Sequence, residues 1–227
     1  MSGIKVDLLP MGDEAVLAQV ADTESVLALA AGLRARIVSA EGIWAQVEEI
    51  VPAARTVLIR LRPSTDLEEL GQQLQEFAAG ADAQAGPETG APSVTVDVVY
   101  DGPDLAEVAG LTGMSAEEVI AAHTGTPWRV AFSGFAPGFA YLVGGDPRLS
   151  VPRHGRPRTN VPAGSVGLAA QFTGIYPRSS PGGWQLIGRT DAVLWDSSAD
   201  PPALLRPGGI VTFRRIEADH TQTGEDR

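Results

Sequence analysis

The stretch PRHGRPRTNVPAGSVGLAAQFTGIYPRSSPGGWQLIGRT, residues 152–190, carries the strongest information about the fold. Between Phe132 and Arg189 the chain has eleven glycines and seven prolines, which separate short apolar runs. Glycine and proline interrupt regular elements and favour turns, and no long amphipathic helix fits between them. Many short strands joined by turns predict a closed or nearly closed β-barrel over residues 127–216.

The same region differs in charge from the rest of the chain. The segment from Phe132 to Arg189 holds six arginines and one acidic residue, a formal charge of +5, whereas the whole chain has a net charge of −11. Such an arginine-rich region in an acidic protein indicates a small anionic ligand. The alternative is that the arginines are solvated or pair with acids elsewhere in the fold. The overall negative charge argues against binding to nucleic acid or to an anionic membrane.

The N-terminal part alternates between strand-like and helix-like patterns. Apolar residues at helical spacing predict helices over residues 24–40 and 65–79. Short β-branched or alternating runs predict strands over residues 4–9, 15–20, 44–50, 55–61 and 94–100. From residue 15 onward the order is β-α-β-β-α-β, which is the ferredoxin-like arrangement. The expected fold class is therefore α+β, with a ferredoxin-like N-terminal domain over residues 1–100.

Two further segments complete the expected organisation. Residues 101–126 are expected to be a helical connector, because Ser115 followed by Glu118 forms a capping box. Residues 217–227 form a polar tail that is expected to be disordered. The chain has no cysteine, no secretory pattern at its start and no apolar run near the ~20 residues of a membrane span. We therefore expect a soluble, cytoplasmic protein.

The composition of the barrel region predicts an anion-binding site. Arginine offers a planar pair of donors that matches carboxylate and phosphate, and glycine-rich loops can expose backbone N–H groups. The residues expected to bind substrate or phosphate are Arg153, Arg158, Arg189, Gly164, Ser165, Gly182 and Gly183. The residues expected to line a pocket or a partner-binding face are Phe135, Pro137, Tyr141, Asn160, Gln171 and Tyr176. For any single glycine, the alternative role is to turn a corner of the barrel.

Histidine and lysine limit the possible chemistry. His154 lies in a loop and is the candidate acid or base, although a lone loop histidine is more often solvated or structural. His123 is expected at a helix end, where a cation is favourable, and is not a strong candidate. No two histidines stand at ligand spacing, so no metal site is expected. The only lysine is Lys5, so a bound nucleotide would be held without the lysine of a phosphate-binding loop.

Three blocks in the barrel region resemble one known protein family. They are GFAPGFAYL at residues 134–142, PRHGRPRTNVPAGSVG at residues 152–167 and TGIYPRSSPGGWQLIGRT at residues 173–190. They are similar to the signature blocks of the family that holds the B subunit of bacterial 5-oxoprolinases, the KipI sporulation-kinase inhibitor and proteins called allophanate hydrolase subunit 1. The similarity extends over nearly the whole chain. Where the family often has a second arginine after Pro-Arg, this chain has His154.

The resemblance implies a fold, an activity and partners. It implies that the C-terminal domain is a cyclophilin-like β-barrel, related to part of the carboxyltransferase region of urea carboxylases. It implies a hydrolase subunit that is unlikely to act alone. In this reading a C subunit of the allophanate hydrolase subunit 2 type assists activation of 5-oxoproline with ATP and Mg, and a transiently bound A subunit opens the ring to give glutamate. The alternatives are a KipI-like inhibitor of a sensor histidine kinase and a subunit that processes allophanate or urea.

Overall fold

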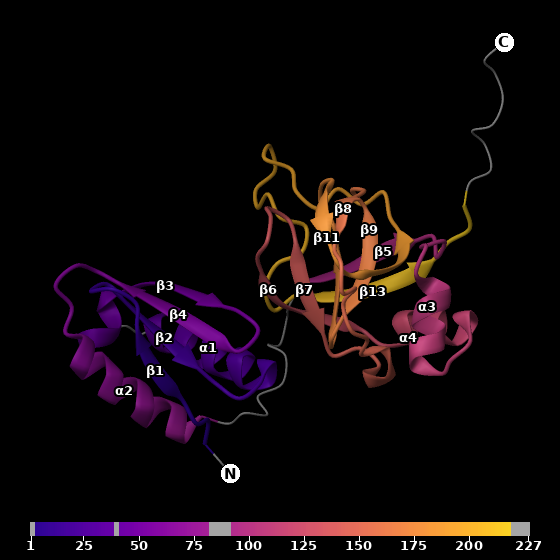
Figure 1. Ribbon diagram of the computed structural model, residues 1–227. Coiled ribbons are helices and arrows are strands. Elements are labelled where there is room, and N and C mark those ends of the chain that lie inside the picture. The colour runs from indigo at the N-terminus through magenta and orange to yellow at the C-terminus, as the bar shows by residue number, and fades with distance from the viewer. Residues whose placement is uncertain (1–2, 39–40, 82–91, 219–227) are drawn as a thin grey trace. The chain divides into compact units, whose positions relative to one another are not determined.

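The computed structural model describes residues 3–38, 41–81 and 92–218 and consists of two compact units, residues 1–88 and 89–227 (Figure 1). Both helices and strands occur in each unit, which confirms the predicted α+β class. Among the described residues, no helix is long and apolar enough to cross a membrane.

The first unit is a four-stranded antiparallel sheet with two helices on one face. Its elements are β1 (Asp7–Pro10), β2 (Ala15–Gln19), α1 (Thr23–Val38), η1 (Gly42–Gln46), β3 (Val47–Pro52), β4 (Thr56–Leu61) and α2 (Leu67–Gly80). The strand order is β1-β2-β4-β3 (Figure 1). Alternation along the strands directs Val16, Ala18, Val57 and Ile59 into the core beneath the helices. The Asp66 carboxylate caps α2 by accepting from the N–H groups of the first turn.

One strand of the predicted ferredoxin-like sheet was assigned wrongly. The segment predicted at residues 94–100 forms β5 (Ser93–Val98), which pairs in parallel with β13 (Ile210–Arg215) in the second unit. The fourth strand of the first sheet is β1, which is joined to β2 by a tight turn at Gly12. The first unit therefore has the order β-β-α-β-β-α rather than β-α-β-β-α-β. The alternating valines of β5 show that it is a strand, but they do not specify which sheet it joins.

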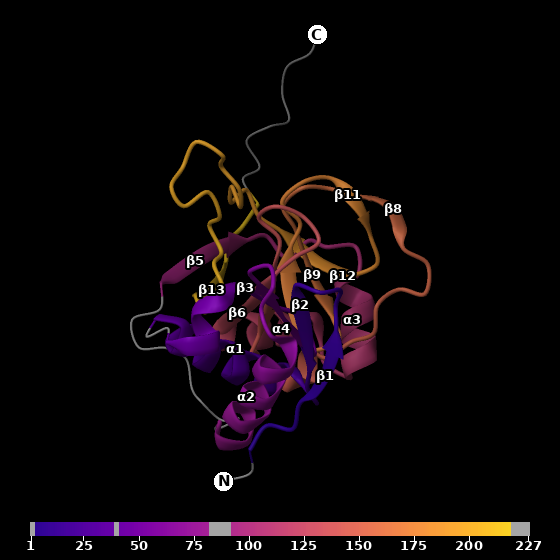
Figure 2. The same ribbon diagram turned by 90° about the vertical axis from the view of Figure 1, so that its left-hand side faces the viewer.

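The second unit is built on a seven-stranded sheet that confirms the predicted barrel. The remaining strands are β6 (Trp128–Ser133), β7 (Ala140–Val143), β8 (Arg158–Val161), β9 (Ser165–Ala169), β10 (Phe172–Ile175), β11 (Ser180–Gly182) and β12 (Gln185–Arg189). The sheet order is β12-β9-β10-β7-β6-β13-β5, and β8 pairs separately with β11. Two backbone hydrogen bonds of 2.9 Å join Val99 to Arg189 and link the two outer strands. The sheet is thereby nearly closed on itself. Figure 2 labels β9 beside β12, the pair at one end of the strand order.

Two helices belong to the second unit. They are α3 (Leu105–Thr112), which packs against β12, and α4 (Ala116–Gly125), which packs against β13; the short helix η2 (Pro147–Leu149) contacts both. Ser115 and Glu118 form the predicted capping box at the start of α4. The segment predicted to connect two domains therefore packs against the barrel. Of the predicted polar tail, residues 219–227 lie outside the described part of the chain.

A buried hydrogen-bonded chain crosses the barrel core. The Nδ1 atom of His123 lies 2.7 Å from the Tyr100 hydroxyl, and Nε2 lies 2.9 Å from Thr173 Oγ1. Thr173 donates to the Gly167 carbonyl, so it accepts from Nε2–H, and Nδ1 accepts from Tyr100. Burial lowers the pKa of His123 to about 3. His123 does lie in the last turn of α4, as predicted, but the expectation of a cation there is wrong, because the ring is fully buried and its lowered pKa keeps it neutral.

Candidate functional site

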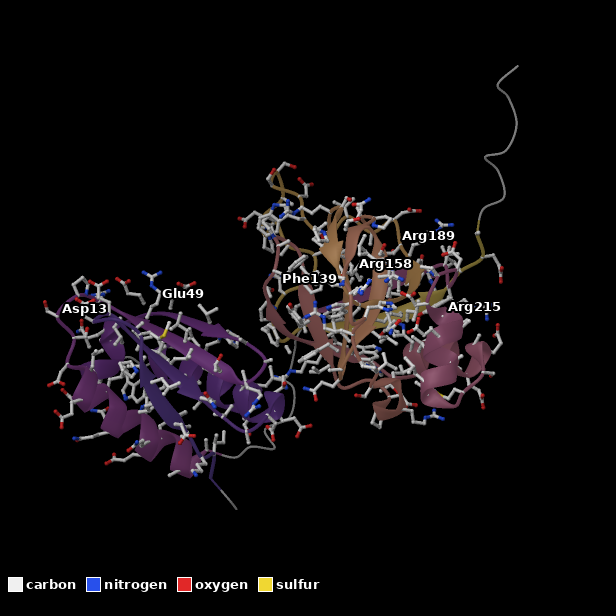
Figure 3. All side chains as sticks on the ribbon, in the orientation of Figure 1. Asp13, Glu49, Phe139, Arg158, Arg189 and Arg215 are labelled. Atoms are coloured by element: carbon white, nitrogen blue, oxygen red, sulfur yellow. The ribbon has the colours of Figure 1, made fainter. Side chains whose placement is uncertain are left out.

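Three of the six arginines between Phe132 and Arg189 pair with acids. Arg148 lies 2.5 Å from Asp146, Arg158 lies 2.5 Å from Asp104, and Arg189 lies 2.9 Å from Asp101; Arg158 and Arg189 are labelled in Figure 3. Asp101 and Asp104 stand outside the segment whose charge is +5, so counting along the sequence missed them. Arg158 and Arg189 therefore pair with acids elsewhere in the fold, as the alternative interpretation describes, whereas Arg148 pairs with the one acid of the segment itself.

Arg153, Arg156 and Arg178 make no ion pair with any residue that the structure describes. Of the three, Arg153 is exposed and lies close enough to two tyrosines for its charge to act on their hydroxyls. Burial raises the pKa of both Tyr141 and Tyr176, and the charge of Arg153 acts in the opposite direction on each hydroxyl. A Cβ atom added at Gly183 would lie 3.6 Å from the Arg153 guanidinium. The structure thus brings four predicted residues together: Arg153, Tyr141, Tyr176 and Gly183. We call this set the arginine–tyrosine site.

A buried aromatic cluster supports the two tyrosines. The Phe139 ring centroid lies 5.0 Å from that of Tyr141, 5.5 Å from Tyr176 and 5.4 Å from Trp184, in edge-to-face arrangements. Such contacts add to the stabilisation from burial and fix ring orientation. Gly182 is required here, because a Cβ atom would lie 2.2 Å from the Tyr176 hydroxyl oxygen. The tyrosine hydroxyls therefore have fixed positions before a ligand arrives.

Phe135 is held in an unusual turn next to this cluster. Its φ is +67°, and the Ala136 N–H donates to the Gly134 carbonyl at 2.8 Å, which makes a γ-turn of the rare, strained hand. The side chain is 58% exposed, yet its ring centroid lies 6.1 Å from that of Tyr176. Residues in sparsely populated backbone regions cluster at functional sites. Phe135 thus presents an apolar ring to solvent at the edge of the arginine–tyrosine site.

Asp104 is the centre of a buried polar network below the loop that carries Arg153. Its side chain is 6% exposed and accepts from Arg158 Nη2 at 2.5 Å and from the Leu186 N–H at 2.6 Å. Burial alone would raise the pKa of Asp104, but Leu186, Arg158 and the nearby His154 together hold it below the usual value. Arg158 also donates to the Trp184 carbonyl at 3.3 Å. The guanidinium of Arg158 is therefore engaged by the protein rather than free for an anion.

His154 faces this network rather than the arginine–tyrosine site. Its Nε2 atom lies 3.2 Å from Asp104 Oδ2, within ion-pairing distance but without hydrogen-bond alignment, and Nδ1 lies 4.0 Å from Glu107. Donor atoms of Asp104, Glu107 and His154 all lie within 4.8 Å of one another, as metal ligands would. The Arg158 guanidinium bound to Asp104 would repel a cation there. We assign no metal to these residues.

Other predicted residues serve the fold. The Gly164 N–H donates to the Tyr176 carbonyl, the Ser165 N–H to the Pro162 carbonyl, and the Ser165 side chain is buried. Asn160 accepts a short hydrogen bond from Ser179. Pro137 and Gln171 are both exposed. The backbone N–H groups of Gly164 and Ser165 are therefore used within the barrel.

Sequence reasoning missed the acidic and amide side of the network. Asp104 directly precedes α3, Glu107 lies in α3 and Gln185 lies in β12. Gln185 Nε2 donates to Glu107 at 3.2 Å and to the Pro152 carbonyl at 3.3 Å. The available signal was the density of acids between residues 97 and 107, in the part of the chain that precedes the arginine-rich segment. Opposite charge in neighbouring segments indicates pairing, but it does not indicate which carboxylate is buried.

A family model for the carboxyltransferase domain, subdomain C and D, matches residues 6–205. The chain is 41% identical over 171 residues to the B subunit of 5-oxoprolinase from Escherichia coli O157:H7, covering 74% of this chain and 77% of that protein. It is 51% identical over 126 residues to the B subunit of 5-oxoprolinase from Bacillus subtilis, covering 54% of this chain and 52% of that protein. The match thus spans about half the length of the Bacillus subtilis relative.

Two other similarities are to a solved structure and to a larger enzyme. A crystal structure of a conserved uncharacterized protein from Pyrococcus horikoshii is 34% identical with a TM-score of 0.54, over 93% of this chain and 98% of that one. A shorter stretch of 75 residues, 30% of this chain and 4% of the relative, is 37% identical to urea amidolyase of Saccharomyces cerevisiae.

Proposed function

Because the chain belongs to the family of the carboxyltransferase domain, subdomain C and D, we propose that it is the B subunit of an ATP-dependent 5-oxoprolinase. The observation that carries this proposal is the 41% identity to the B subunit of a 5-oxoprolinase over 77% of that protein's length. The proposed reaction opens the lactam 5-oxoproline to glutamate with hydrolysis of ATP. The proposed site is the arginine–tyrosine site of the second unit.

The chemistry of this site suits an anionic substrate. Arg153, which pairs with no described acid, can bind a carboxylate or a phosphoryl group by donating two parallel hydrogen bonds to its oxygens. Because burial raises the pKa of Tyr141 and Tyr176, both hydroxyls stay protonated at neutral pH and can donate to the same anion. Preorganised donors of this kind stabilise charge that develops as a carbonyl is activated. No residue of this chain is required to form a covalent intermediate.

The chain supplies only part of the chemistry. ATP, brought with Mg, would supply the phosphoryl group that activates the lactam, but the described residues offer it one unpaired guanidinium here and no lysine of a phosphate-binding loop. We therefore propose that a C subunit of the allophanate hydrolase subunit 2 type completes the site. An A subunit would bind transiently and open the ring, so this chain would be inactive alone.

The test is ATP hydrolysis and glutamate release from 5-oxoproline by the three-subunit assembly. Arg153→Ala is expected to lower kcat/KM for 5-oxoproline by roughly 10- to 100-fold, the loss expected for a charged hydrogen bond. Arg156→Ala is the matched control, since Arg156 lies in the same loop, is exposed and pairs with no described acid. Equal losses in both variants would argue against a specific role of Arg153.

An inactive wild-type assembly would refute 5-oxoproline as the substrate. The similarity to urea amidolyase then makes urea-derived amides such as allophanate the next substrates to assay. Binding to a sensor histidine kinase, as for a KipI-like inhibitor, would be measured with the same preparation. These assays separate the proposed enzyme subunit from both alternatives.

A further inference from the structure

Asp104 stands at a helix start but does not cap its own helix. It occupies the position before the first residue of α3, where an aspartate usually accepts from the N–H groups of the first turn. No such side-chain hydrogen bond is present. The carboxylate instead turns toward β8 and β12 and is almost fully buried. The carboxylate therefore contacts segments that are distant in the sequence instead of stabilising the start of α3.

Those contacts join three parts of the barrel. One oxygen accepts from Arg158 at the start of β8, and the other accepts from the backbone of Leu186 in β12. His154, four residues before Arg158 in the chain, places its ring 3.2 Å from the second oxygen. The Asp104 carboxylate therefore hydrogen-bonds the C-terminal end of the loop of residues 152–158 and lies within ion-pairing distance of His154 in the middle of the loop.

The same loop is held at further points by its backbone. The His154 N–H donates to the Gly183 carbonyl at 2.8 Å, and Gln185 donates to the Pro152 carbonyl at 3.3 Å. Arg153 lies between Pro152 and His154, so both of its neighbours are anchored. Its own side chain makes no ion pair with a described residue. The position of the Arg153 guanidinium therefore depends on how firmly the loop is fixed.

We propose that Asp104 is a positioning residue that fixes the loop of residues 152–158 and so places Arg153 beside Tyr141 and Tyr176. This inference rests on the proposed function, in which Arg153 binds the anionic substrate. Asp104 acts only through the loop and does not touch substrate. An ionised carboxylate is required, because both of its oxygens accept hydrogen bonds. An asparagine of the same shape would turn an NH₂ group toward Arg158 or toward the Leu186 N–H.

The first measurement is backbone amide hydrogen exchange in the purified chain. Asp104→Asn is expected to raise exchange of the His154 N–H, which donates to the Gly183 carbonyl, by roughly tenfold or more, because local opening sets the exchange rate of a hydrogen-bonded amide. Asp101→Asn is the matched control, since Asp101 is an exposed carboxylate close by in the chain that pairs with Arg189 at 2.9 Å. The control should leave exchange in this loop unchanged. Unchanged exchange in Asp104→Asn would overturn the inference.

The second measurement is a double-mutant cycle in the three-subunit assembly. Asp104→Asn should raise KM for 5-oxoproline and lower kcat/KM roughly tenfold in the wild-type background, but less than twofold in the Arg153→Ala background. Residues that act on the same contact give such non-additive effects. Equal losses in both backgrounds would overturn the inference, because they would indicate a general structural role.

A folding defect would not prevent the test. If Asp104→Asn does not fold, Arg158→Lys removes the planar donor pair at the same contact and keeps the charge, and the same two outcomes apply to it. An inactive wild-type assembly would refute the proposed function and this role with it. An active wild-type assembly with an additive cycle would refute the positioning role alone.

Discussion

The two units differ in the sequence separation between the strands that pair with each other. In the first unit the outer pairs, β1 with β2 and β3 with β4, are formed by strands that follow each other directly. In the second unit, β5 pairs with β13, so that Ser93 lies opposite Ile210, and Val99 pairs with Arg189. The arginine–tyrosine site lies entirely in the second unit. The site thus depends on long-range contacts that local sequence patterns do not reveal.

The largest expected effect comes from breaking the link between the two edges of the barrel. A Cβ atom at Gly102 would lie 2.3 Å from backbone atoms of Leu186 and Ile187, which cannot move aside as a side chain could. Gly102→Ala is therefore expected to destabilise the chain by roughly 3 kcal/mol, as measured by thermal or denaturant unfolding. Gly110→Ala is the control: that glycine lies within α3, with open space around its Cβ position, and alanine there should stabilise by about 0.5–1 kcal/mol. Equal stability of the two variants would show that the edges are not tightly joined.

The next largest effect is the pH dependence of folding stability. Titration of histidine can contribute to it only in the second unit. All three histidines lie beyond residue 88, and His123 is fully buried with its pKa lowered to about 3. The unfolded chain takes up a proton below about pH 6.5, which the folded chain resists, so stability falls as pH falls from 6.5 toward 3. Between pH 7 and pH 5 the expected loss is about 2 kcal/mol.

Denaturant unfolding at several pH values measures this loss. His123→Gln can keep a donor and an acceptor in the core but does not titrate, so it should be less stable at pH 7 and show a smaller change between pH 7 and pH 5. An unchanged pH dependence in His123→Gln would assign the proton uptake to other groups.

The same contrast explains which elements and which site residues could be predicted from the sequence. The periodicity of α1 and α2 and the turns of the barrel are local patterns, and the helices, the barrel and the capping box at Ser115 followed from them. The partner of β5 did not, because alternating valines fit either sheet. Within the site, Arg153 and the two tyrosines were predicted from residue type. Arg158 was assigned to an anion because Asp104, 54 residues earlier in the chain, is brought to it only by folding.

The smallest expected effect is on folding stability, when glycine replaces either of two residues with positive φ, one in each unit. Ser64 has a φ of 66° in the first unit, and Phe135 has a φ of 67° beside the arginine–tyrosine site. Glycine adopts this region without strain, so Ser64→Gly should stabilise the chain by roughly 1 kcal/mol in denaturant unfolding. Phe135→Gly should gain a similar amount from the backbone but lose the ring contacts with Phe139 and Tyr176, which leaves a net change near zero. In the three-subunit assembly, Phe135→Gly should nevertheless lower 5-oxoproline turnover while Ser64→Gly leaves it unchanged, because only the strain at Phe135 holds a ring at the site. A Phe135→Gly variant that is both stabilised and fully active would show that the strained turn serves neither the ring contacts nor the proposed reaction.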